Sequence, residues 1–373
     1  MSSRSGIISS VIIVILVFSA VGGYIFLTNQ YVPSNIAIVV LDPGFGDRSM
    51  VDQAYGGLAD VEVVVNYNVE VATDAANARD IMESIAAAGQ HDLIVAIGHG
   101  LAGPVTDAAG NYPNQRFALI GAEPTLSLAN VASATFAQNQ AAFLAGSLAA
   151  FLATNHANSS GIVGILGSVE GDPIVEELIA GFLHGLNHAN TTYNLDVSLL
   201  PIDYVGSYND SDTAHLRAYG MFSPITGNAS VIFAPVRASI MGVRTAMEQA
   251  NETYFHDITG REPYVIAAEG DQDYLGNPNI DIAAGPSWIV TSVVPRSDLA
   301  VAQLINATLW FEFPGTQSFL YNLSLVNDED RGVDLSPMQF RDSTWVTDHM
   351  LNVTTDYRQA ILNGTIVVDN SLP

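Results

Sequence analysis

The sequence contains no cysteine and no lysine. The absence of cysteine excludes disulfide bonds, thiolate zinc sites, cysteine nucleophiles and an anchor attached to a lipid-modified cysteine. All 12 basic residues are arginine, against 38 acidic residues, which gives a formal net charge of −26. This balance argues against nucleic-acid binding, which needs a basic face, and against adsorption to an anionic membrane surface.

The motifs of several enzyme classes are also absent. There is no Walker A loop and no His-Glu-X-X-His helix, and Gly44 and Gly46 lack the third glycine of a dinucleotide fingerprint. The segment Gly167–Gly171 reads Gly-Ser-Val-Glu-Gly, which is not the Gly-X-Ser-X-Gly of a nucleophile elbow. We therefore expect a protein that is not an enzyme, with no catalytic residues, cofactor or metal.

An uncharged segment occupies the start of the chain. Residues 5 to 30 carry no charge, and Ile7 to Leu27 are mainly Ile, Val, Leu and Phe. About 20 such residues cross a hydrocarbon core, and Arg4 before them favours placing the bulk of the chain outside the cell. We expect a signal anchor and transmembrane helix over residues 1–30. A cleaved signal, with its site near Ser19–Gly23, remains the alternative.

The rest of the chain contains nine Asn-X-Ser/Thr sequons, which together fit an exported glycoprotein. They begin at Asn158, Asn190, Asn209, Asn228, Asn251, Asn306, Asn322, Asn352 and Asn363.

From Ile36 onwards, short β-branched runs alternate with helical patterns. This rhythm predicts an α/β fold with parallel sheets covered by helices on both faces. Two such runs of similar length predict two Rossmann-like three-layer lobes. Strands are also expected at Val61–Asn66 and, near the end of the chain, at Thr365–Val368.

The most informative stretch is the first strand-to-helix junction. The apolar run Ile36–Leu41 predicts a strand buried on both faces, and Pro43, Gly44 and Gly46 interrupt it after Asp42. Asp47 or Ser49 can cap the helix that follows. Open α/β sheets bind ligands at such junctions, because free backbone N–H groups point into the crevice. On this stretch alone, an ordinary capped βα turn is the favoured explanation of the same residues.

Eight blocks of the sequence, in the same order, resemble the basic membrane protein (BMP) family of ABC transporter substrate-binding proteins. Purine nucleosides are the best-known ligands of that family. The blocks are Gly46–Leu58, Asp92–Gly98, Tyr112–Ala118, Asn130–Phe136 with Phe143–Gly146, Tyr204–Asp210, Glu269–Gln272, Thr291–Asp298 and Gly332–Pro337.

The resemblance implies a type I periplasmic-binding fold, in which two lobes are joined by a hinge and close on a ligand. It also implies lobes that are discontinuous in sequence. Lobe 1 is expected over 31–128 plus 288–318, and lobe 2 over 129–287 plus 319–373.

The resemblance further implies ligand contacts at the first junction. Asp47, Ser49 and Met50 would contact a base, and Asp52 keeps an acidic residue of the family pattern. Met50 replaces a stacking phenylalanine, and Val51 replaces an asparagine. For Asp47, capping of the helix is an equally good explanation.

Other candidates lie on later loops. His99 follows the strand ending at Ile97 and could stack on a ligand or lie on a surface loop. Phe136 opens lobe 2 and could instead pack at the hinge. Arg237 could bind an anion or pair internally with Glu269 or Asp271. In the family an acidic residue in the Glu269/Asp271 block binds ribose hydroxyls. The complete ligand-binding set is Asp42, Asp47, Ser49, Met50, Asp52, His99, Phe136, Arg237, Glu269 and Asp271.

These observations predict a solute-binding protein of an ABC importer, anchored in the cell membrane with its C-terminal domain outside. Its partners would be a small polar ligand such as a nucleoside, permease and ATPase subunits, and the membrane, but no nucleic acid. Two alternatives stay open: a receptor-like sensor, and a structural surface protein that has lost its ligand.

Overall fold

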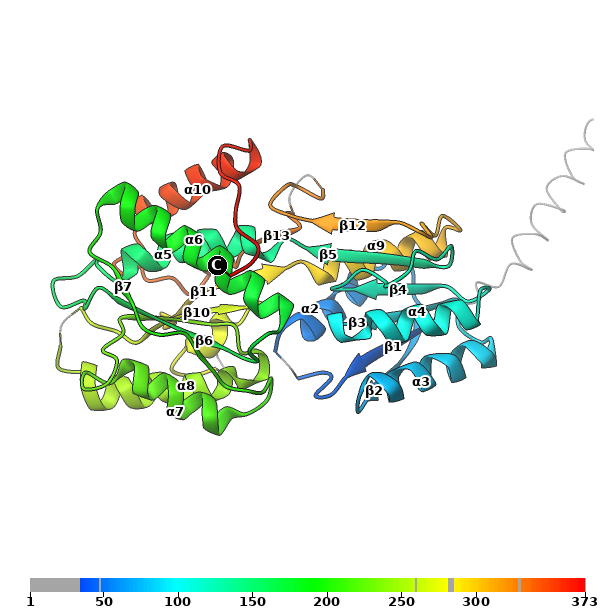
Figure 1. The fold of residues 1–373 in the computed structure, drawn as a ribbon, viewed down its shortest axis with the longest axis horizontal. Coiled ribbons are helices and arrows are strands. Elements are labelled where there is room, and N and C mark those ends of the chain that lie inside the picture. The colour runs from blue at the N-terminus through cyan, green and yellow to red at the C-terminus, as the bar shows by residue number, and fades with distance from the viewer. Residues whose placement is uncertain (1–33, 47, 259, 281–284, 328–329, 373) are drawn as a thin grey trace, which may run out of the picture.

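The computed structural model describes residues 34–372, apart from 47, 259, 281–284 and 328–329. They form two lobes side by side, each built on one β-sheet with helices on both faces (Figure 1). The signal anchor predicted over residues 1–30 lies outside the described residues. Among the residues that are described, none of the helices is long and apolar enough to cross a membrane.

The sheet of lobe 1 has the strand order β12-β5-β4-β3-β1-β2, and all its strand pairs are parallel. Its strands are β1 (Asn35–Leu41), β2 (Asn66–Ala72), β3 (Leu93–Ile97), β4 (Phe117–Ile120), β5 (Val131–Phe136) and β12 (Ser318–Tyr321). Helices α3 (Ala75–Ala88) and α4 (Ala102–Asn111) pack together on one face, and α2 (Met50–Gly56) and α9 (Ser297–Leu309) on the other.

The sheet of lobe 2 has the order β13-β11-β10-β9-β6-β7, and β8 also pairs with β6. Its strands are β6 (Ile162–Gly167), β7 (Ser198–Leu199), β8 (Asp203–Tyr204), β9 (Val231–Ala234), β10 (Tyr264–Ala268), β11 (Ile289–Pro295) and β13 (Val333–Leu335). Only β13 runs antiparallel among the described strands of this sheet. Its helices are α5 (Gln138–Leu152), α6 (Pro173–Tyr193), α7 (Ser211–Phe222), α8 (Ile240–Ala250) and α10 (Asp348–Leu362).

Three connections join the lobes, and they follow β5, β11 and β12. The expected lobe boundaries differ from this arrangement. They place β5 and all of β12 except Ser318 in lobe 2, and β11 in lobe 1. Hydrogen bonding instead places β5 and β12 in the lobe 1 sheet and β11 in the lobe 2 sheet. The sequence marks where a crossover occurs, but sheet membership depends on distant strand partners.

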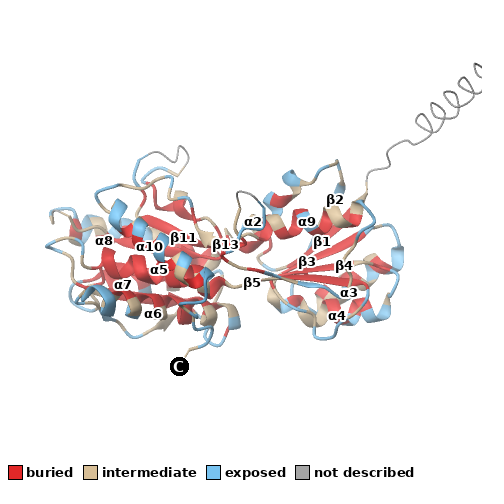
Figure 2. Ribbon diagram, turned by 90° about the horizontal axis from the view of Figure 1, so that it is seen from above, coloured by how far each residue is buried: buried red, intermediate tan, exposed pale blue. Residues whose placement is uncertain are grey.

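Buried strands form the centre of both lobes, and the waist between them is narrow (Figure 2). The run Ile36–Val40 is wholly buried, as expected for a parallel strand covered on both faces.

Two of the strands predicted from the sequence are wrong. The second strand is Asn66–Ala72 rather than Val61–Asn66, because the polar edge strand pairs with β1 while the valine-rich stretch before it is irregular.

The strand predicted at Thr365–Val368 is also absent, although these residues are described. Their backbone groups are bonded elsewhere. Ile366 N donates to Ala360 O at 3.0 Å, and Val368 O accepts from the Asn139 side chain at 3.3 Å. The tail therefore packs on α10 and α5 instead of extending a sheet.

Candidate functional site

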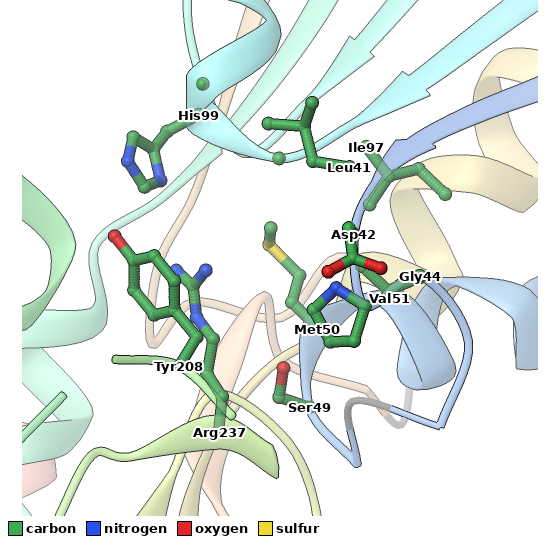
Figure 3. Close-up of a pocket in the computed structure, with 13 residues that line it drawn as sticks. Leu41, Asp42, Gly44, Ser49, Met50, Val51, Ile97, His99, Tyr208 and Arg237 are labelled. Carbon is green, nitrogen blue, oxygen red and sulfur yellow. The ribbon is translucent and has the colours of Figure 1, made fainter. Parts of the chain in front are cut away.

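The candidate site lies where the carboxyl ends of β1 and β3 in lobe 1 face lobe 2. A cavity of about 230 Å³ is found there. Lobe 2 contributes Tyr208 and Arg237, and lobe 1 contributes the remaining lining residues (Figure 3). They are Leu41, Asp42, Pro43, Gly44, Ser49, Met50, Val51, Ile97, Gly98, His99 and Gly100. Its volume is below the range of about 300–1,000 Å³ that is typical of small-molecule pockets, so this arrangement suits a small ligand.

The loop after β1 shapes one wall of this cavity. Gly44 has a φ of +69°, which glycine adopts without strain. The Asp52 carboxylate accepts the N–H groups of Gly46 and Arg48, each at 2.8 Å. Asp52 thus holds the loop and does not line the cavity, whereas the two residues at the start of α2, Ser49 and Met50, do line it.

Residues of lobe 2 form a connected polar group opposite this wall. Asp172 caps α6, because its Oδ1 accepts the N–H of Ile174 at 2.8 Å and of Val175 at 3.2 Å. Its Oδ2 accepts a hydrogen bond from the Tyr208 hydroxyl. The guanidinium of Arg237 lies 4.4 Å from the centre of the Tyr208 ring, a cation–π contact. The side chains of Asp172, Tyr208 and Arg237 are therefore fixed relative to one another.

Arg237 also pairs with a buried carboxylate. Its Nε donates to Glu269 Oε2 at 2.8 Å, and Glu269 is only 1% exposed. Both residues have positive φ angles, +50° and +68°, a strain that is typical of functional loops. Burial opposes the charge of Arg237, but Glu269 and Asp172 together raise its pKa, so that it stays charged. Nη2 of Arg237 is buried and has no hydrogen-bond partner among the described residues.

A contact across the cleft connects the two lobes. His99 Nε2 lies 3.4 Å from Asp172 Oδ2. Burial, the largest cause, lowers the pKa of His99; Asp172 opposes this effect and Arg237 adds to it. Burial would raise the pKa of Asp172, but the Tyr208 hydrogen bond, the neighbouring His99 and the charge of Arg237 together lower it. The carboxylate therefore stays ionised at neutral pH.

The lobes also touch through main-chain groups at the start of α2. Gln272 Nε2 donates to Arg48 O at 2.6 Å, and a Cβ on Gly270 would lie 2.9 Å from Ser49 Cα. Ser297 Oγ, at the start of α9, donates to Met50 O at 3.0 Å. The residues that line the cavity are thus held from several directions.

The predicted residues fall into three groups. Asp42, Ser49, Met50, His99 and Arg237 line the cavity, and Glu269 contacts it through Arg237. Asp52, Phe136 and Asp271 do not line it. Asp47 lies outside the described residues.

The residues of the second group have other surroundings. Phe136 is 6% exposed and packs against Tyr321, their ring centres 5.3 Å apart, at the connection between the lobes. Asp271 lines a separate cavity of about 320 Å³ beside Arg296. In this structure Arg237 adopts the internal ion pair with Glu269 that the sequence left open.

The structure brings two further residues to the site, Asp172 and Tyr208, which the sequence patterns do not single out. Asp172 directly precedes Pro173 at the start of a helix, which is an N-cap signal that carries no information about ligands. Tyr208 lies in the Tyr204–Asp210 block that resembles the family. No group of three or more metal-ligating side chains suited to a metal ion occurs in the described part of the chain.

Two parallel-sheet lobes that enclose a cavity at the tips of their strands define a bilobal solute-binding protein. Comparisons with known proteins support the same class of protein. The family model described as "ABC transporter substrate-binding protein PnrA-like" matches residues 35–371. The chain therefore belongs to this family, and it is the ligand-binding component of an ABC transporter system and not an enzyme.

Individual relatives are distant. The ABC transporter nucleoside-binding protein BmpA of Lactococcus lactis is 24% identical, over 82% of this chain and 84% of that protein. An uncharacterised lipoprotein of Pyrococcus abyssi is 24% identical over 80% of this chain and 69% of its own length. A crystal structure of an ABC transporter solute-binding protein from Aeropyrum pernix superimposes with a TM-score of 0.77 at 21% identity, covering 91% of this chain and 94% of that one. That similarity shows the fold.

Proposed function

We propose that this chain is the extracellular, membrane-anchored receptor of an ABC importer, and that its ligand is a small, uncharged polar molecule such as a nucleoside. The observation that carries the proposal is the interlobe cavity, which combines side chains from both lobes at the strand tips. A ligand bound there contacts both lobes and favours their closure. Permease and ATPase subunits would then receive the ligand from the closed form.

The charges around the cavity favour an uncharged ligand. Among the described residues, three carboxylates lie on or beside it, those of Asp42, Asp172 and Glu269, against the one guanidinium of Arg237 in its lining. Because Glu269 already pairs with Arg237, a phosphate or carboxylate ligand would meet excess negative charge. Nucleotides are therefore poorer candidates than nucleosides.

The lining also suits a flat ring attached to a group with several hydroxyls. Met50, His99 and Tyr208 offer apolar or aromatic surface for a ring (Figure 3). Asp42 and Ser49 offer oxygen atoms that accept hydrogen bonds from hydroxyls. The name of the Lactococcus relative, a nucleoside-binding protein, points to the same ligand class.

Calorimetric titration with nucleosides, free bases, ribose and nucleoside monophosphates tests the ligand class. We expect heat of binding with one or more nucleosides and about tenfold weaker binding after Asp42→Asn, because a hydroxyl loses a charged acceptor. Asp80→Asn, a change at an exposed residue of α3, is the matched control and should bind as the wild type does. Binding of monophosphates in preference to nucleosides would contradict the proposal.

Protease protection and alkaline carbonate extraction of cell membranes test the anchor. The membrane-anchored form should stay in the pellet, and protease added outside the cell should digest the lobes. Release of a chain that begins near residue 20 would show instead that the segment is a cleaved signal.

A further inference from the structure

The end of lobe 1 farthest from the cleft carries a pair of exposed aromatic residues. Helix α9 ends at Leu309, and the next two residues, Trp310 and Phe311, are 58% and 86% exposed. Val64, in the loop before β2, is 76% exposed. Single exposed apolar residues are common on protein surfaces, but two adjacent aromatic side chains require an explanation. We call Val64, Trp310 and Phe311 the aromatic pole.

The loop before β2 is fastened to the end of α9. Trp310 Nε1 donates to Glu62 Oε2 at 3.0 Å, and Glu62 N donates to Asn306 Oδ1 at 3.0 Å. These bonds hold the indole and bring the loop that contains Val64 to the same end of the lobe. The exposed apolar groups therefore belong to one ordered surface.

The backbone of Phe311 keeps its side chain away from the core. Phe311 has a φ of +60° at the left-handed position that ends α9, where Glu312 N donates to Ala307 O at 2.8 Å. Glycine and asparagine are the usual residues at this position, and α3 and α6 end on Gly89 and Asn194. A phenylalanine here is strained, and most of its side chain is exposed to solvent.

The start of the described chain lies at the same end of lobe 1. Asn66 N donates to Ser34 O at 2.9 Å, and Asn66 follows Glu62 by only four residues (Figure 1). Residues 28–34 connect this point with the apolar segment Ile7–Leu27. A connection of seven residues reaches at most about 25 Å. If the apolar segment spans the membrane, Ser34 stays within that distance of the lipid, and the aromatic pole lies at the same end of lobe 1.

We propose that the aromatic pole rests on the lipid surface, with Trp310 and Phe311 inserted into the bilayer interface. This inference rests on the proposed membrane anchor. Tryptophan is enriched at such interfaces because its ring is apolar and its N–H is polar, and phenylalanine is common on the inserted face of interfacial elements. The contact would hold the cleft, which lies at the opposite end of lobe 1, on the side away from the lipid.

The charges near the pole indicate which lipid it contacts. Three exposed acidic residues lie near the pole. Asp60 and Glu62 come shortly before Val64, and Glu312 directly follows Phe311. They repel anionic headgroups, so that the pole should bind zwitterionic lipid, through apolar insertion. Anionic lipid should weaken the contact, and added salt should restore it.

Tryptophan fluorescence of the full chain, reconstituted in phosphatidylcholine vesicles with brominated or ordinary acyl chains, tests the proposal. The variant W288F/W345F leaves Trp310 as the single tryptophan. Its emission should be about twofold lower in brominated vesicles, because bromine quenches a ring located at the interface. The matched control is I225W/W288F/W310F/W345F, in which the single tryptophan replaces Ile225, a residue that is 91% exposed on lobe 2. Its emission should be the same in both kinds of vesicle.

Equal Trp310 emission in the two kinds of vesicle, from protein that resists carbonate extraction, would overturn the proposal but leave the anchor intact. Extraction of the protein by carbonate would refute the anchor and, with it, this inference. Nucleoside titration of the same sample reports on the cleft separately. If W288F/W345F does not fold, W310F in the otherwise unchanged chain should remove the quenching. Quenching that persists in W310F would also overturn the proposal.

Discussion

Nε2 of His99 and Oδ2 of Asp172 lie 3.4 Å apart across the cleft, and they belong to different lobes. His99 follows β3 of lobe 1, and Asp172 begins α6 of lobe 2. Separation of the lobes at this point must break the contact. Because Asp172 also accepts the Tyr208 hydroxyl, and Tyr208 lies against Arg237, one contact joins lobe 1 to the whole polar group of lobe 2.

The lowered pKa of His99 predicts a loss of stability in acid. Since the folded protein keeps this side chain neutral, the unfolded chain binds a proton more readily. The corresponding stability is present above the ordinary pKa of about 6.5 and is lost as the pH falls through the lowered pKa. Between about pH 7.5 and pH 5, the Tm of the wild type should fall by more than the Tm of His99→Gln.

Differential scanning calorimetry over this pH range provides the measurement. His215→Gln, a change on the exposed face of α7, is the control and should follow the wild type. If the Tm of the wild type falls less towards acid pH than the Tm of His99→Gln, the attraction of Asp172 outweighs burial in setting the pKa of His99.

The ion pair between Arg237 and Glu269 predicts strong coupling between these two side chains. Arg237→Met leaves Glu269, which is 1% exposed, without its cationic partner, and should lower the free energy of unfolding by about 3 kcal/mol. The double variant R237M/E269M should recover most of this loss, because it no longer leaves Glu269 as a buried carboxylate without its cation. Urea denaturation of the wild type, both single variants and the double variant measures the coupling; additive losses would argue against it.

Asp172 should contribute more stability than an ordinary helix cap. Asp74 caps α3 through Asn77 N at 2.8 Å, and Asp74→Ala should lower the free energy of unfolding by about 1 kcal/mol. Asp172→Ala also removes the acceptor of the Tyr208 hydroxyl, and should cost about 1 kcal/mol more than Asp74→Ala. Tyr208→Phe in the Asp172→Ala background should recover part of the difference. Equal losses of unfolding free energy at Asp172 and Asp74, measured by urea denaturation, would show that Asp172 acts only as a helix cap.

Much of the fold could be predicted from the sequence because local signals and lobe architecture agree. The buried strand Ile36–Leu41, the glycine loop after it and the helix beginning near Ser49 are all present. The second strand was placed too early because its own residues, Asn66–Ala72, are half exposed at the sheet edge and carry a weaker apolar signal than the valines before them.

The candidate site could be predicted less completely, because its geometry depends on residues distant in sequence. Asp52 looked like a ligand contact, but its carboxylate turns back to the loop N–H groups. Asp172 looked like a helix cap, and only the packing of the lobes brings it to His99, which is 73 residues earlier in the chain. Spacing along the chain gives no information about contacts of this kind.

The neighbouring glycines Gly56 and Gly57 should respond in opposite directions to substitution by alanine. Gly56 ends α2 in helical geometry and an added Cβ would meet nothing within 4 Å, so Gly56→Ala should stabilise the protein by about 0.5–1 kcal/mol. A Cβ on Gly57 would lie 2.2 Å from the main-chain oxygen of Asp298, so Gly57→Ala must push α2 away from α9. Because α2 carries Met50 into the cavity and Ser297 of α9 bonds its carbonyl oxygen, this change should lower both the Tm and ligand affinity. Thermal unfolding and nucleoside titration of the two variants measure these effects, and equal Tm shifts would show that the contact between α2 and α9 does not position the site.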